Sequence, residues 1–112
     1  MLLSTVSESR RQQRVSVNAQ FRGGGASTNL HGQVTDLSAS GIFLATTSFL
    51  AVGKQVHLEF DLPTGKVEAV GEVRWVARGS AVPLQGMGIR FLRLSAPAAR
   101  AIDDAIDTSQ DE

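Results

Sequence analysis

Two short clusters of polar residues carry the most recognisable chemistry in this chain. The first is Arg10-x-x-x-Arg14, and the second is Asp36-x-Ser38-x-x-Gly41. Arginine offers a planar cationic fork that binds a phosphate, or the O6/N7 edge of guanine, through paired hydrogen bonds. A carboxylate accepts hydrogen bonds from guanine N–H groups, a serine adds a hydroxyl, and a glycine lets backbone approach closely. Together the clusters predict a site for a small, anionic, guanine-bearing ligand.

Three further residues are candidate contacts of the same ligand. Arg11 adds charge to the first cluster, Ser40 adds a second hydroxyl, and Gly88 leaves room for a ligand or for neighbouring backbone. Each feature also has an ordinary structural explanation. Arginines near a terminus often form a solvated basic segment, Asp-x-Ser often closes a turn on its own backbone, and strand glycines often mark bulges.

Size and composition limit the classes of protein to consider. The chain has 112 residues, 42% of them hydrophobic, which suits one domain with its own core. The formal net charge is zero, which disfavours a bulk nucleic-acid-binding domain, and the lack of cysteine excludes disulfides and thiolate chemistry. We find no secretory leader and no apolar run near the ~20 residues that cross a membrane. We therefore expect a cytoplasmic protein.

Alternating apolar and polar residues predict a mainly β fold. We expect strands at 15–21, 30–37, 42–45, 55–62, 67–77 and 85–94. The run Gly23-Gly24-Gly25 predicts a flexible loop, and a change of phase near Val70-Gly71 predicts a bulge or bend. Trp75 is in phase with Val73, so we expect it to anchor the core. Short strands joined by turns favour a six-stranded antiparallel β-barrel.

A helix is expected to follow the last strand. Ser95 is a candidate N-cap with Pro97 in the first turn, and apolar residues at helical spacing extend over 96–107. This C-terminal α-helix would cover the flank of the barrel. The predicted organisation is a flexible N-terminus at 1–8, a folded domain at 9–107 and an acidic tail at 108–112.

Catalysis and metal binding find no support in the sequence. His31 and His57 are isolated, without carboxylates or cysteines at metal-ligand spacing. Ser38 has no evident histidine base, so nucleophilic catalysis is not expected. We assign no catalytic residue, no metal and no enzymatic activity.

Four segments resemble the PilZ domain, and the resemblance covers roughly residues 9–107. They are Ser9–Val17, Asp36–Leu44, Gly71–Val76 and Gly86–Phe91. The resemblance implies a six-stranded barrel that binds cyclic di-GMP as ligand, with no other cofactor. It also implies that Arg10, Arg14, Asp36, Ser38 and Gly41 hold the ligand, as one molecule or as an intercalated dimer. The protein would then signal through ligand-dependent contact with a protein target.

Two other functions remain open on the sequence. The first is an adaptor with the same fold that works without ligand. The second is a single-stranded nucleic-acid-binding barrel, which would need a basic groove with interleaved aromatic residues. The chain has only five Phe, one Trp and no Tyr, which makes this second function the weaker alternative.

Overall fold

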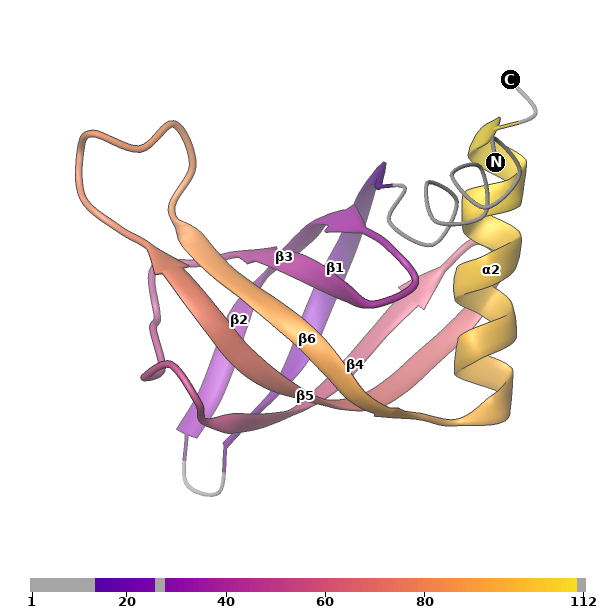
Figure 1. The fold of residues 1–112 in the computed structure, drawn as a ribbon, viewed down its shortest axis with the longest axis horizontal. Helices are drawn as coiled ribbons and strands as arrows, with labels where there is room; N and C mark the ends of the chain where they lie inside the picture. Colours follow the sequence, from indigo (N-terminus) through magenta and orange to yellow (C-terminus); the bar gives the residue numbers. More distant parts are fainter. Residues whose placement is uncertain (1–13, 26–27, 111–112) are drawn as a thin grey trace, which may run out of the picture.

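The structure is a closed antiparallel barrel followed by one helix (Figure 1). It is a computed structural model that describes residues 14–25 and 28–110. Its strands are β1 (Val15–Gly25), β2 (Thr28–Leu37), β3 (Gly41–Ala45), β4 (Gln55–Leu62), β5 (Gly65–Ala77) and β6 (Gly86–Leu94). Around the barrel the strands follow the order β1-β2-β3-β6-β5-β4. The predicted fold class is confirmed.

The interior of the barrel is filled by the apolar residues of the alternating strands. Strand β4 shows the pattern clearly, since Val56, Leu58 and Phe60 are buried while Gln55 and His57 are exposed. Successive side chains of a strand point to opposite faces, so one face of each strand lines the core. The largest fully buried side chains are Phe21, Phe60, Leu37, Leu44 and Met87.

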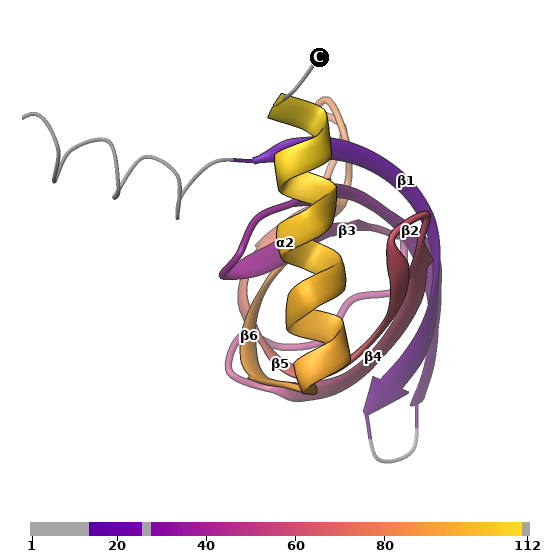
Figure 2. The ribbon, with the colours of Figure 1, turned by 90° about the vertical axis from the view of Figure 1, so that its right-hand side faces the viewer.

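Helix α2 (Ala96–Gln110) packs against β5 and β4, and Figure 2 views the barrel with this helix in front. Ser95 is its N-cap, as predicted, because its Oγ accepts a hydrogen bond from the backbone N–H of Ala98 at 3.1 Å. The hydroxyl of Thr64, in the turn between β4 and β5, donates to the carbonyl of Ala101 at 2.6 Å. The apolar face of the helix is buried, with Ala98, Ala101, Ile102 and Ile106 among the core residues.

The glycine run does not form the predicted flexible loop. Gly23, Gly24 and Gly25 continue β1 and pair with β2, and Gly23 and Gly24 also pair with β4. At Gly23 the strand passes so close to β4 that an added Cβ would overlap the carbonyl of His57, and φ is +149°. Only glycine tolerates this combination, so here the glycines permit strand pairing.

Two irregularities interrupt the ladder between β5 and β6. The first lies between Val70 and Gly71, as predicted, and places its extra residue on β6 at Leu92. The second lies between Val73 and Trp75 and places its extra residue, Arg74, on β5. This second bulge shifts the alternation of β5, so that Trp75 is 46% exposed. The prediction that Trp75 anchors the core is therefore wrong.

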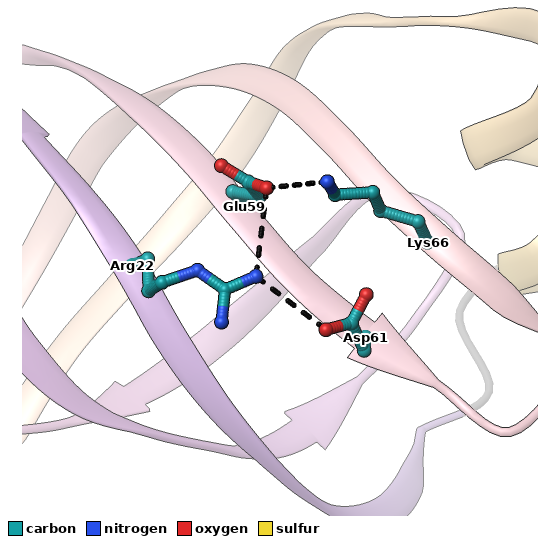
Figure 3. Close-up of polar contacts among 4 residues, drawn as sticks. All are labelled: Arg22, Glu59, Asp61 and Lys66. Carbon is teal, nitrogen blue, oxygen red and sulfur yellow. Dashed lines mark hydrogen bonds and ion pairs between the residues drawn. The ribbon is translucent and has the colours of Figure 1, made fainter.

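A network of exposed charges crosses the outer faces of β1, β4 and β5 (Figure 3). Arg22 lies 3.5 Å from Glu59 and 3.4 Å from Asp61, and Lys66 lies 2.7 Å from Glu59. The hydrogen bond and positive charge of Lys66 lower the pKa of Glu59 below its ordinary value. The same interaction raises the pKa of Lys66.

Candidate ligand-binding cleft

A cleft of about 350 Å³ opens where the turn between β2 and β3 meets β5 and β6. Its walls include five of the residues singled out from the sequence: Arg14, Ser38, Ser40, Gly41 and Gly88. The remaining walls are Ile42, Arg74, Trp75, Ile89 and Arg90. The structure therefore brings Arg14, which directly precedes β1, to the same place as the Ser38–Gly41 turn.

The turn between β2 and β3 is organised by Ser38. The N–H of Ser38 donates to the carbonyl of Gly41 at 2.9 Å, and the Ser38 hydroxyl donates to the same carbonyl at 3.4 Å. The Ser38 Oγ also accepts a hydrogen bond from the N–H of Ser40 at 3.3 Å. Ser38 is only 2% exposed, whereas Ser40 is exposed. Ser38 thus shapes the wall of the cleft, and Ser40 presents the more accessible hydroxyl.

Gly41 allows this turn to lie directly against β6. A Cβ added to Gly41 would overlap the backbone carbonyl of Ile89, which cannot move without disturbing the barrel. The carbonyl of Ser40 also accepts a hydrogen bond from the N–H of Phe91 at 2.8 Å. The glycine of the second sequence cluster is therefore required by packing between strands.

The charged walls of the cleft are all arginines. Arg14, Arg74 and Arg90 line it, and no acidic residue of the described chain does. Arg74 forms an ion pair with Glu72 at 3.1 Å. The sequence analysis did not single out Arg74 or Arg90. No pattern in the local sequence marks them, because their position depends on the pairing of β5 with β6.

The single tryptophan forms an aromatic wall of the cleft. Gly88 lies opposite Trp75 in the β5–β6 ladder, and an added Cβ at Gly88 would overlap the indole Nε1. Trp75 also stacks on Phe43, with ring centroids 5.3 Å apart and an angle of 29° between the rings. Phe43 is buried, so it supports a ring that is itself about half exposed. This arrangement presents an aromatic surface beside three guanidinium groups.

The other predicted residues lie elsewhere or outside the described residues. Asp36 is half-buried on β2, where it pairs with Ser16 of β1 and Phe43 of β3, and it does not line the cleft. Arg10 and Arg11 lie outside the residues that the structure describes.

The rest of the described chain shows no stronger candidate site. A larger cavity of about 650 Å³ has walls of mixed charge, including Arg22, Arg93, Glu59 and Glu68. Over residues 14–25 and 28–110, no three His, Cys, Asp or Glu side chains gather as metal ligands. No helix in this part of the chain has the length and apolar character needed to cross a membrane.

The chain thus forms a six-stranded barrel with a C-terminal helix and a cleft walled by three arginines and one tryptophan. The sequence matches the family model described as "PilZ domain" over residues 8–107. The chain therefore belongs to the PilZ domain family, as the sequence resemblance predicted. No curated protein matches the chain at a significant level.

Solved structures with the same fold share little sequence with this chain. The inhibitor of motility MotI/DgrA from Bacillus subtilis is 16% identical with a TM-score of 0.73, over 87% of this chain and 49% of that one. The PilZ domain of YcgR from Escherichia coli with c-di-GMP is 16% identical with a TM-score of 0.68, over 88% and 89%. YcgR in complex with c-di-GMP is 17% identical with a TM-score of 0.73, over 88% and 45%. The chain thus spans about half the length of MotI/DgrA and of YcgR.

Proposed function

We propose that this protein is a non-enzymatic cytoplasmic receptor that binds cyclic di-GMP in the cleft between the Ser38–Gly41 turn and β6. The observation that carries the proposal is the meeting of Arg14 with this turn in one cleft. Two solved structures of one protein with the same fold, YcgR, contain c-di-GMP. The ligand would act by changing the surface that the domain presents to a protein target.

Charge supports an anionic ligand of small size. Three arginines line a cleft of about 350 Å³, while the formal net charge of the whole chain is zero. A compact ligand with two phosphates suits such a local cluster better than a long nucleic acid, which usually needs an extended basic surface. In this proposal Arg10, Arg14 and Arg11 contact phosphates or the O6/N7 edges of guanine, and Arg74 and Arg90 add to the positive field.

The walls of the cleft also suit a purine base. Trp75 exposes about half of its indole beside the arginines, and stacking of a base on an aromatic ring contributes about 1–3 kcal/mol. Ser40 and the Gly41 backbone would contact the ligand, and Ser38 would hold their turn in place. Asp36 would accept hydrogen bonds from the guanine N–H groups. For this contact the ligand must extend beyond the cleft toward β2. Gly88 contributes indirectly, because its lack of a side chain leaves room for the indole of Trp75.

Calorimetric titration of the full chain with cyclic di-GMP tests the proposal, with GTP and cyclic di-AMP as control ligands. Of these three nucleotides, we expect only cyclic di-GMP to bind. Arg14→Ala should weaken binding at least about tenfold, because a hydrogen bond to a charged group contributes about 1.5–3 kcal/mol. Arg10→Ala and Asp36→Ala test two of the three residues whose placement in the site is inferred, and each should also weaken binding.

Arg100→Ala is the matched control, because Arg100 is an exposed arginine on α2 and does not line the cleft. Each variant should keep the circular dichroism spectrum of the parent barrel. The proposal is wrong if cyclic di-GMP gives no binding heat, or if Arg14→Ala binds as tightly as Arg100→Ala.

A further inference from the structure

Strand β6 has an edge that is only partly covered. It pairs with β5 along most of its length, but its pairing with β3 ends where Gly41 lies opposite Arg90. The last backbone contact on this side is the hydrogen bond from Phe91 N–H to the Ser40 carbonyl at 2.8 Å. From Leu92 to Leu94, no strand of the described chain pairs with the edge of β6 that faces away from β5.

Three side chains around this edge are exposed, one apolar and two positively charged. The bulge on β6 brings Leu92 to the surface, where it is 43% exposed, and both Arg90 and Arg93 are exposed. A notch of about 260 Å³ lies here, with Ser40, Arg90 and Arg93 among its walls. Within the described part of the chain, neither of these arginines forms an ion pair with a carboxylate.

We infer that this notch and the edge Leu92–Leu94 bind an extended, acidic segment of a partner protein. An extended segment can add to a sheet edge through main-chain hydrogen bonds while its side chains provide specificity. Carboxylates on the segment would pair with Arg90 and Arg93 on the outer face of the sheet, and the apolar side chains between them would lie on the opposite face, on the side of Phe91 and Leu94. Arginine forms bidentate pairs with carboxylates, which fixes the register of such a segment.

Charge argues against a second copy of this chain as the occupant. Two β6 edges pairing with each other would bring the exposed Arg90 and Arg93 of one copy close to the same residues of the other. Like charges across paired strands are destabilising, and charged side chains on an edge commonly prevent such self-pairing. An acidic segment removes this repulsion and turns it into attraction.

The inference goes beyond the proposed nucleotide receptor, since this edge can bind a segment whether or not the cleft binds a nucleotide. The two sites are nevertheless neighbours, because Ser40 and Arg90 line both the cleft and the notch. A ligand in the cleft and a partner at the edge would therefore both contact Ser40 and Arg90. A titration of this edge without nucleotide therefore gives an outcome that is independent of the proposed function.

The probe is a synthetic eight-residue peptide of alternating Glu and Val, acetylated and amidated at its ends, titrated into the isotope-labelled full chain. We expect the largest amide shifts at Leu92–Leu94 in ¹H–¹⁵N spectra and weaker binding at higher salt. The same peptide with Lys in place of Glu should not bind. Arg93→Glu should weaken binding at least tenfold, whereas Arg100→Glu, an exposed control on α2, should leave it unchanged.

Two further peptides separate edge pairing from simple charge attraction, without altering the protein. One is N-methylated at every Glu and the other at every Val, so each loses the N–H donors along one edge of the strand. Edge pairing predicts that one methylated peptide binds and the other binds at least tenfold more weakly. Equal binding of both, shifts confined to the cleft residues, or Arg93→Glu binding like Arg100→Glu would overturn the inference.

Discussion

Gly88→Ala is expected to displace the single tryptophan from the wall of the cleft. A methyl group at this position would overlap the indole of Trp75, which lies against Gly88 and also stacks on Phe43. The φ of Gly88 is not positive, so the backbone itself accepts alanine. The ring is the group that must move, and its contacts set the cost.

The size of the effect follows from the burial of the ring. Trp75 is 46% exposed, so about half of a side chain that covers up to ~250 Å² is buried. Complete loss of this burial would cost about 3 kcal/mol at 25 cal/mol per Å², and the aromatic pair adds ~1 kcal/mol. Because a displaced ring keeps part of its contacts, we expect the free energy of unfolding to fall by roughly 1–3 kcal/mol. The melting temperature should fall by roughly 5–15 °C.

Urea denaturation and tryptophan fluorescence measure both consequences. Since the chain has one Trp, its emission reports on this ring alone, and Gly88→Ala should shift it to longer wavelength. A double-mutant cycle with Trp75→Ala identifies the cause, because residues in contact give non-additive costs. In the Trp75→Ala background, Gly88→Ala should cost less than ~0.5 kcal/mol. Equal costs in the two backgrounds would refute the explanation, since the clash would then lie elsewhere.

Three other changes test the packing of α2 against the barrel and the charges on the outer face of the barrel. Ser95→Ala removes the N-cap of α2 and should lower the free energy of unfolding by about 1 kcal/mol in urea titrations. Thr64→Val removes the hydrogen bond to the Ala101 carbonyl and should cost about 1 kcal/mol in the same assay. Lys66→Met should raise the pKa of Glu59 toward its ordinary value, followed by NMR titration of the carboxyl carbon. Because the native pKa of Glu59 is lowered, its ion pair with Lys66 stabilises the fold at pH values above the ordinary carboxylate pKa. This stabilisation is lost as the pH falls through the lowered value. The Lys66→Met variant should therefore be less stable than the parent protein at neutral pH and equally stable in strong acid.

Local patterns were enough to predict most of the fold. The alternation in Gln55–Leu62 has a period of two residues, which is the signature of a strand with one buried face. Ser95 marked the start of α2 because N-caps depend on the side chain and the next turn only. The glycine run was misassigned because the residue that it approaches closely, His57, lies on another strand. Nothing in the local sequence reveals this contact.

The candidate site was predicted less completely, and for a related reason. Arg14 and the Ser38–Gly41 turn were found because their residue types and spacing form recognisable clusters. Arg74 and Arg90 were missed because only the register of β5 on β6 brings them to the cleft. Trp75 was placed in the core because its phase was read from Val73 without the bulge between them.

The two bulges together explain why the functional surfaces lie where they do. In a regular strand Arg74 and Trp75 would point to opposite faces, so one of them would be directed into the barrel. The extra residue in β5 lets both line the cleft, and the extra residue in β6 exposes Leu92 beside Arg93. Arg90 lies between these irregularities and lines both the cleft and the notch. A barrel of this topology with a regular β5–β6 ladder would keep the free edge of β6 but lose the aromatic wall and the bulged Leu92. We therefore assign the side chains that distinguish these two surfaces to the departures from regular pairing.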